Sequence, residues 1–150
     1  MKKVLILMAT YNGAKYLDEQ IQSLIEQKNV QVDILVRDDG STDNTIEVLN
    51  KWKEQNKLEW YKGKHLNVQF GFYDLMERAR TRDVDYLAFC DQDDVWDLDK
   101  LCIAVEKLEK LCNKSMPALY YCGQRLVDEN MKFIADHKLN KYRNLRTRFV

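Results

Sequence analysis

The sequence predicts an α/β domain built on a mainly parallel sheet with helices on both faces. Short apolar runs alternate along the 150-residue chain with segments whose apolar residues recur at helical spacing. This alternation is typical of β-α-β units, in which a crossover helix follows each parallel strand. One proline and five glycines leave no stretch that is typical of a linker, so a single domain is expected over residues 1–150.

Five apolar runs are the predicted strands of the sheet. The first, residues 4–9, is continuously apolar, as expected for a strand that is buried on both faces. The others are residues 32–36, 58–61, 86–90 and 118–122. After them, residues 126–127 and 133–134 flank the polar stretch 128–130, which predicts a hairpin.

Four helices are predicted from apolar residues spaced three or four apart. Their apolar positions are, in order, Leu17, Ile21, Leu24 and Ile25; Ile46, Leu49 and Trp52; Phe72, Leu75, Met76 and Ala79; and Leu98, Leu101, Cys102, Val105, Leu108 and Cys112. Ser41, Thr42 and Asp43 are expected to cap the second helix, because such side chains accept hydrogen bonds from first-turn amides.

The charges of the chain cancel overall but are unevenly placed. Residues 1–135 carry 19 Lys and Arg against 23 Asp and Glu, whereas residues 136–150 carry five against one. An acidic body argues against nucleic acid as the main partner. The basic end is a candidate for peripheral contact with an anionic membrane surface, and the alternative is a solvated basic segment.

Cysteine usage and the N-terminus both predict a cytoplasmic protein. The four cysteines, Cys90, Cys102, Cys112 and Cys122, form no C-x-x-C pair and are read as small buried hydrophobes in a reducing compartment. The apolar run of residues 4–9 is too short for a signal peptide or a membrane span.

Polar clusters follow three of the predicted strands. They are residues 10–13, residues 37–43 and residues 91–94. In a parallel sheet the carboxyl ends of these strands lie at one edge, where ligands bind in open α/β folds. Each cluster alone is explained by a turn or a helix cap, but together they predict a ligand site.

The third cluster, Asp91-Gln92-Asp93-Asp94, predicts a divalent cation. Carboxylates at the exit of a buried strand need a counter-charge or a metal. The glycine pattern of dinucleotide-binding folds and the P-loop motif are both missing from the sequence, so a bound diphosphate would need another source of neutralisation. Asp91 and Asp93, two positions apart, suit Mn²⁺ or Mg²⁺ bridging to phosphate oxygens.

The same residues, taken in order, resemble family 2 glycosyltransferases of the GT-A fold. The resemblance rests on residues 9–13 with Leu17, on residues 38–43, and on residues 91–96 followed by residues 99–101. It covers essentially the whole chain and is closest to bacterial rhamnosyltransferase-like members. It implies a Rossmann-like three-layer sandwich and a chain that is an N-terminal, donor-binding portion of a longer protein.

The resemblance also implies the roles of individual residues. Residues expected to bind the nucleotide-sugar are Thr10, Tyr11, Asn12, Asp38, Asp39, Asn67, Gly71, Asp91 and Gln92. Within this set Thr10 and Tyr11 would line the base pocket, and Asp38 or Asp39 would hydrogen-bond the base. The metal ligands would be Asp91 and Asp93, as the Asp-x-Asp pair. Trp96 is expected to pack under this acidic loop, and His65 to lie in a loop or at the surface.

The implied function is a metal-dependent inverting glycosyltransferase of surface polysaccharide synthesis. It would move a sugar from a UDP- or dTDP-sugar to a saccharide or lipid-linked acceptor, in the cytoplasm or at the inner face of the membrane. The general base is expected beyond Val150, because Asp128 and Asp136 match it poorly. One alternative is a nucleotide-sugar-binding module without catalysis, and another is a phosphotransferase with an aspartyl nucleophile at residues 38–42.

Overall fold

A computed structural model describes residues 1–65, 67–111, 117–128 and 130–137 of the chain. The chain divides into two compact units, residues 1–106 and residues 107–150. Each unit is described by itself, beginning with the first.

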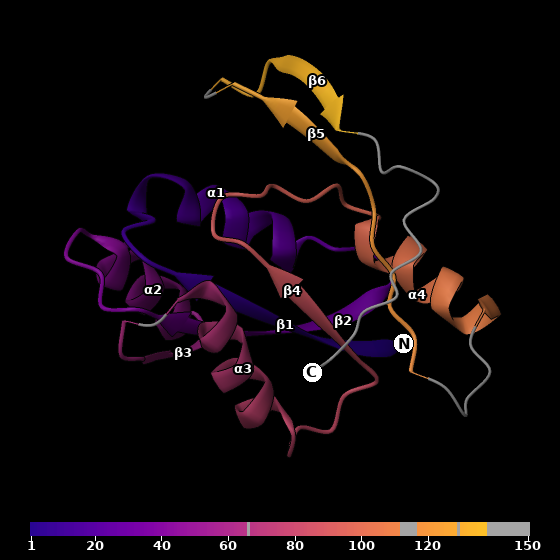
Figure 1. The fold of residues 1–150 in the computed structure, drawn as a ribbon, viewed down its shortest axis with the longest axis horizontal. Helices are drawn as coiled ribbons and strands as arrows, with labels where there is room; N and C mark the ends of the chain where they lie inside the picture. Colours follow the sequence, from indigo (N-terminus) through magenta and orange to yellow (C-terminus); the bar gives the residue numbers. More distant parts are fainter. Residues whose placement is uncertain (66, 112–116, 129, 138–150) are drawn as a thin grey trace. The chain divides into compact units, whose positions relative to one another are not determined.

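The first unit is built on a four-stranded sheet in which every pair is parallel (Figure 1). Its strands are β1 (Lys2–Thr10), β2 (Val30–Asp38), β3 (Glu59–Lys62) and β4 (Tyr86–Cys90), in the order β3-β2-β1-β4. The register sets Thr10 opposite Asp38 and Met8 opposite Cys90. The ends of β1, β2 and β4 therefore lie at one edge, as the sequence predicted.

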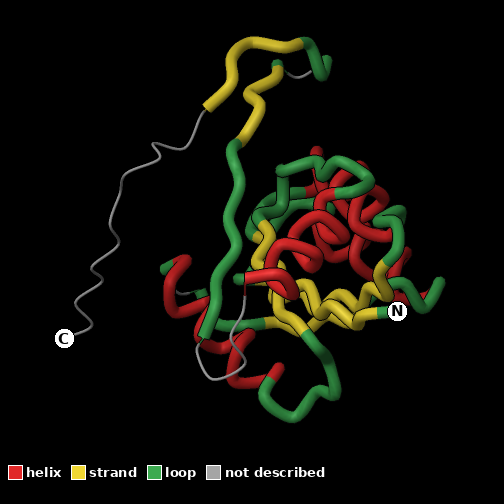
Figure 2. The backbone as a smooth tube through the Cα atoms, turned by 90° about the vertical axis from the view of Figure 1, so that its right-hand side faces the viewer, coloured by secondary structure: helices red, strands yellow, loops and turns green. Residues whose placement is uncertain are grey.

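Helices cover both faces of this sheet, which gives three layers (Figure 2). The helices are α1 (Ala14–Ile25), α2 (Thr45–Glu54), α3 (Val68–Ala79) and the part of α4 (Lys100–Leu111) that belongs to this unit, up to residue 106. Side chains alternate along β1: Ile6 packs in a core with α1 and α2, and Leu7 packs on the other face with Leu75 of α3. The predicted α/β fold with a mainly parallel sheet is confirmed.

The described part of the second unit contains an antiparallel hairpin of β5 (Gln124–Val127) and β6 (Phe133–His137). Its turn is held by Asp128, whose Oδ1 accepts hydrogen bonds from the amides of Asn130 and Lys132, both at 2.9 Å. The predicted hairpin is confirmed, with strands slightly longer than the apolar pairs that indicated it.

The prediction of a fifth sheet strand at residues 118–122 is wrong. These residues form no strand, and Leu119 is 72% exposed. A strand exists only where its backbone is paired, and in the described residues of this unit the one ladder joins β5 to β6. An apolar run cannot by itself specify a pairing partner.

Two helices begin later than predicted, because tertiary hydrogen bonds hold the preceding residues in loops. α2 follows Asn44 rather than Ser41, Thr42 or Asp43, although Asp43 Oδ1 still accepts from the amide of Thr45 at 3.0 Å. α4 begins at Lys100, so Leu98 precedes it. There the carbonyl of Leu98 accepts from the amide of Lys28 at 2.9 Å.

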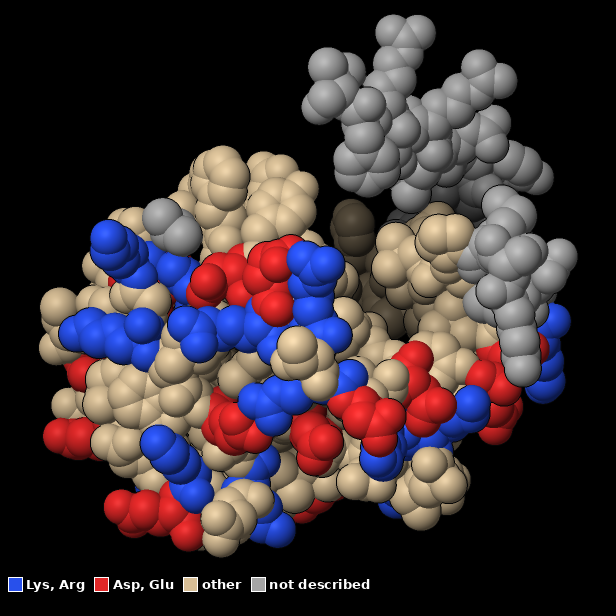
Figure 3. All heavy atoms as spheres, turned by 90° about the horizontal axis from the view of Figure 1, so that it is seen from below, with Lys and Arg blue, Asp and Glu red and all other residues tan. Residues whose placement is uncertain are grey.

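Two further predictions concern the distribution of charge and contact with a membrane. Basic and acidic side chains are interspersed on the face of the molecule in Figure 3. None of the helices in the described ranges has the length and hydropathy that a membrane span requires. The basic segment predicted to contact a membrane is residues 136–150, and all five of its Lys and Arg residues lie in 138–150, outside the described residues.

The cysteines are less enclosed than predicted. Cys90, on β4, is buried, but Cys102 and Cys122 are half-buried. All three are free thiols, and Cys112 lies outside the described residues.

Candidate functional site

Gln92 joins the loop after β4 to the loop after β1. Its Oε1 accepts hydrogen bonds from Thr10 Oγ1 at 2.6 Å and from the amide of Tyr11 at 2.9 Å, and its Nε2 donates to the Tyr11 carbonyl at 3.3 Å. A Cβ on Gly13 would lie 2.3 Å from Gln92 Oε1. Glycine at position 13 therefore leaves the space that this amide fills.

Asn12 joins the same loop to the one after β2. The backbone N–H of Asn12 donates to Ser41 Oγ at 2.9 Å, and its side-chain Oδ1 accepts from the backbone N–H of Thr42 at 2.8 Å. Asn12 adopts a φ of 50°, a conformation that asparagine tolerates better than most residues. The amide of Gly13 donates in turn to Thr45 Oγ1 at 2.9 Å. The predicted residues 10–13 are thus a junction between two neighbouring loops.

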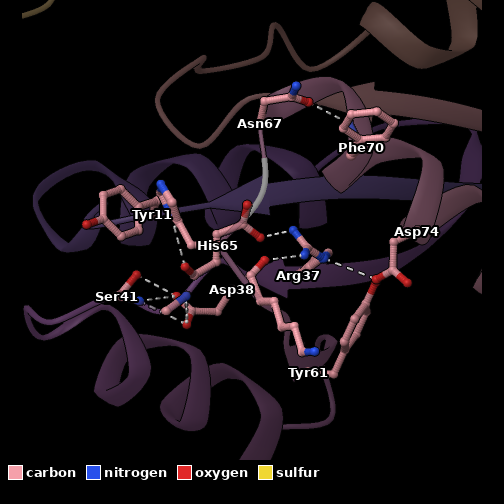
Figure 4. A network of polar contacts seen from close by, with 12 residues as sticks. Tyr11, Arg37, Asp38, Ser41, Tyr61, His65, Asn67, Phe70 and Asp74 are labelled. Carbon is pink, nitrogen blue, oxygen red and sulfur yellow. Dashed lines mark hydrogen bonds and ion pairs between the residues drawn. The ribbon is translucent and has the colours of Figure 1, made fainter.

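Asp38 and Asp39 differ in what their carboxylates do. Asp38 is fully buried, and its two oxygens accept from the amides of Gly40 and Ser41 and from Ser41 Oγ (Figure 4). Gly40 has a φ of 91°, which glycine adopts without strain. Asp38 therefore builds the turn of its own loop. Asp39 instead accepts through Oδ1 from Arg37, and its side chain keeps 9% exposure.

His65 and Asn67 of the connection between β3 and α3, and Gly71 in the first turn of α3, are the remaining predicted residues near this site; Figure 4 labels the first two. His65 Nδ1 lies 3.3 Å from the carbonyl of Asp39, and the His65 ring lies 4.7 Å from that of Tyr11. Asn67 caps α3, since its Oδ1 accepts from the amide of Phe70 at 3.0 Å. Gly71 is buried beside Arg37. The donor-binding roles predicted for Asn67 and Gly71 stay predictions.

The acidic loop after β4 holds Asp91 near two other carboxylates. Burial, together with the nearby charges of Asp94 and Asp93, raises the pKa of Asp91 above its usual range. No three potential metal-binding side chains converge within the described ranges of the chain. The assignment of Asp91 and Asp93 as metal ligands stays a prediction, and their mutually repelling carboxylate oxygens are donors suited to a hard cation.

Sequence reasoning missed a polar stripe on the buried side of α1 and just beyond its end. Gln20 donates to Cys90 Sγ at 2.8 Å, and the thiol donates to the Asp91 carbonyl at 3.0 Å. Burial raises the pKa of the Cys90 thiol, which keeps its proton for that bond. Ser23 Oγ accepts from the amide of Trp96 at 3.0 Å. Trp96 itself is buried under the loop, as predicted.

Gln27 completes this attachment of the acidic loop. Its Nε2 donates to the Asp97 carbonyl at 2.8 Å, and its Oε1 accepts from the amide of Leu101 at 3.0 Å. Gln20, Ser23 and Gln27 are spaced three and four positions apart. At this spacing residues lie on the same face of a helix, and Gln27, just after the end of α1, continues that face. The sequence did contain a signal for this attachment: Gln20, Ser23 and Gln27 have the helical spacing that is typical of buried apolar residues.

Solved structures with this architecture define the class of protein, which is the GT-A fold of glycosyltransferases. S. aureus TarS 1–349 superposes with a TM-score of 0.60 at 24% identity, over 73% of this chain and 33% of that one. The mannosyltransferase PcManGT from Pyrobaculum calidifontis, in complex with GDP-Man and Mn²⁺, gives a TM-score of 0.57 at 25% identity, over 70% and 32%.

The chain belongs to glycosyl transferase family 2, which it matches over residues 5–149. It is 36% identical over 137 residues to the dTDP-rhamnosyl transferase RfbG of Shigella flexneri, spanning 81% of this chain and 45% of that protein. It is 28% identical over 112 residues to the putative teichuronic acid biosynthesis glycosyltransferase TuaG of Bacillus subtilis, over 73% and 43%. The chain thus spans less than half the length of these relatives.

Proposed function

We propose that this chain binds the donor of a metal-dependent inverting glycosyltransferase in surface polysaccharide synthesis. The donor would be a UDP- or dTDP-sugar, and the acceptor a saccharide or a lipid-linked saccharide. The proposed location is the cytoplasm or the inner face of the membrane. The similarity to a dTDP-rhamnosyl transferase at 36% identity supports a nucleotide-sugar donor.

One observation carries the proposal: Gln92 and Asn12 join three loops at the carboxyl edge of the sheet by hydrogen bonds of 2.6–2.9 Å. Ligands of open α/β sheets bind at this edge. Loops that are already joined lose little conformational freedom when a ligand binds, so the site is preorganised.

Asp39 is the better of the two candidates for hydrogen-bonding the base. Both oxygens of Asp38 are occupied by its own loop, whereas Asp39 uses Oδ1 for Arg37 and keeps Oδ2. Uracil and thymine each present an imide N–H that a carboxylate oxygen accepts. Tyr11 and His65, whose rings lie 4.7 Å apart beside Asp39, would form the wall of this pocket.

Asp91 and Asp93 would hold the metal. Oxygen donors and the raised pKa of Asp91 both fit a divalent cation, because a cation would relieve the repulsion between these carboxylates. When bound, Mn²⁺ or Mg²⁺ would neutralise the donor diphosphate and stabilise its departure. The polar stripe of Gln20, Ser23 and Gln27 would hold the loop in position for this.

Transfer would proceed by attack of an acceptor hydroxyl on the anomeric carbon, opposite the diphosphate. The new bond joins the acceptor oxygen to that carbon, and the bond to the diphosphate oxygen breaks with inversion. The hydroxyl proton would pass to an Asp or Glu general base, which we expect beyond Val150.

Calorimetric titration of the chain with UDP and dTDP tests the proposal. We expect binding in Mn²⁺ or Mg²⁺ that weakens by about tenfold or more in a chelator, and equally in Asp93→Ala. Asp97→Ala, an exposed aspartate of the same loop, is the control and should bind like the wild type. Equal affinity with and without metal would contradict metal dependence.

A second candidate is donor binding without catalysis by these 150 residues, since the chain spans 45% of its rhamnosyl transferase relative. Incubation with a dTDP- or UDP-sugar and a saccharide acceptor distinguishes the two. Release of free nucleoside diphosphate together with a glycosylated product would reject the binding-only alternative.

A further inference from the structure

Arg37 is a charged side chain in the interior of the first unit. It lies near the end of β2 and is 1% exposed. Its guanidinium donates to Asp39 Oδ1, to Asp74 Oδ2 at 3.1 Å and to the carbonyl of Lys64 at 2.6 Å (Figure 4). A buried charge persists only where it is paired and hydrogen-bonded, so these three partners account for its presence.

Two glycines make room for this guanidinium. A Cβ on Gly63 would lie 2.5 Å from its atoms, and one on Gly71 would lie 3.1 Å from Nη1. Neither glycine has a positive φ, so close approach rather than backbone conformation requires glycine at both positions. Gly63, which follows β3, and Gly71, in the first turn of α3, therefore leave the space that Arg37 fills.

The charges around Arg37 balance in pairs. Asp74 accepts from Arg37 and from Tyr61 Oη at 2.6 Å, and Arg78 lies 3.8 Å from the same Asp74 oxygen. Burial, followed by the hydrogen bond to Asp74, raises the pKa of Tyr61, so its hydroxyl keeps the proton it donates. Asp74 is paired with Arg78 and Tyr61 as well as with Arg37. Arg37 is therefore the cation that compensates the charge of Asp39.

Asp39 is held so that one of its oxygens stays available. Arg37 takes Oδ1, and Oδ2 lies 3.7 Å from where a Cβ on Gly71 would stand. An ionised carboxylate accepts hydrogen bonds and donates none. A fixed, ionised Asp39 therefore favours a ligand group that carries N–H over one that carries a lone pair.

We propose that Arg37 is a positioning residue that sets base selectivity by holding Asp39 as a hydrogen-bond acceptor beside Gly71. This rests on the proposed function, in which Asp39 meets the base. The selectivity is for uracil and thymine, which present an imide N–H, over cytosine, which presents a lone pair at the same ring position. Without Arg37 the largely buried carboxylate of Asp39 loses its counter-charge and its fixed orientation. The selectivity for uracil and thymine over cytosine should then be lost as well.

The test is the ratio of dissociation constants for CDP and UDP, measured by calorimetry on the whole chain with Mn²⁺. We expect the wild type to bind UDP about tenfold or more tightly than CDP, because a mismatched buried acceptor is costly. In Arg37→Lys and Arg37→Gln the ratio should fall to within about threefold, since neither side chain offers the fork of donors that arginine has. dTDP should behave like UDP.

Gly63→Ala perturbs the same contact while keeping the arginine, because its methyl group would displace the guanidinium. It should lower the ratio as well, and it keeps the proposal testable if the Arg37 variants do not fold. Leu75→Ala, a buried residue of α3, is the control for lost stability and should leave the ratio unchanged.

A wild-type ratio in Arg37 variants that are merely less stable would overturn the proposal and leave the proposed function standing. Absence of UDP and dTDP binding by the wild type would overturn both.

Discussion

Thr10 and Gln92 lie 82 positions apart in the sequence and share a hydrogen bond of 2.6 Å between Thr10 Oγ1 and Gln92 Oε1. Through it the end of β1 is tied to the loop that follows β4, although these segments are joined in the chain only through two other strands and three helices. The side chain between the two acidic metal candidates therefore has a structural partner of its own.

Removing this tie should weaken ligand binding more than stability. Gln92→Ala deletes one side chain that contacts Thr10 and Tyr11, and it leaves the acidic residues in place. Because the loops then lose their preorganisation, we expect UDP or dTDP to bind about tenfold more weakly in Mn²⁺. Calorimetry measures this, with Gln31→Ala, an exposed glutamine of β2, as the control. Unchanged affinity in Gln92→Ala would show that the tie does not organise the site.

Gly13→Ala should be destabilising because of Gln92 and not because of the backbone. Gly13 has a φ of −103°, which alanine adopts freely, but the new methyl group would meet the Gln92 amide at 2.3 Å. The Gln92 amide can move aside but would leave its hydrogen bonds to Thr10 and Tyr11, so we expect a loss of about 1–3 kcal/mol in the free energy of unfolding. In urea titrations the double variant Gly13→Ala/Gln92→Ala should cost little more than Gln92→Ala alone. Additive effects of the two substitutions would contradict the proposed clash.

Gln27 should contribute to stability through the start of α4. Gln27→Met keeps the volume but leaves the amide of Leu101 and the carbonyl of Asp97 without their partner. We expect the free energy of unfolding to fall by about 1–3 kcal/mol. Gln22→Met, on the exposed side of α1, should be neutral in the same urea titration. A neutral Gln27→Met would mean that the acidic loop is held by other contacts.

The pair of Glu59 and Arg82 should make a small part of the stability depend on pH. Arg82 donates to both Glu59 oxygens, at 2.9 and 2.7 Å, and this hydrogen bonding lowers the pKa of Glu59 below 4.5. A lowered pKa in the folded state means stabilisation that is present above the unfolded pKa and is lost as pH falls through the folded one.

Arg82→Gln should therefore cost stability at pH 7 and cost progressively less as the pH falls below about 4.5. Both side chains are more than a third exposed, so the effect should stay below about 1 kcal/mol. Urea unfolding at pH 7 and at pH 3 gives the difference, and Lys57→Gln removes an exposed positive charge as the control. A cost that is the same at both pH values would mean that the ion pair contributes nothing.

The order of elements could be read from the sequence because it depends on local patterns. The continuous apolar run in β1 and the helical spacing of Leu17, Ile21 and Leu24 each specify one element without reference to the rest of the chain. The polar residues that follow β1, β2 and β4 were placed at one edge by the rule for parallel sheets alone. The resemblance of these residues to family 2 glycosyltransferases implied a GT-A fold, and this expectation is confirmed.

Pairing and side-chain partnership were decided only in three dimensions. Residues 118–122 have the composition of a strand but form none, because composition does not specify which strand they would pair with. The sequence presents Asp38 and Asp39 as equivalent neighbours. Only packing shows that Asp38 closes its own turn while Asp39 is held by Arg37. Local chemistry thus determined the fold class and the sheet edge at which we propose the site, whereas the burial and hydrogen bonds of distant residues decided which side-chain atoms there are already paired.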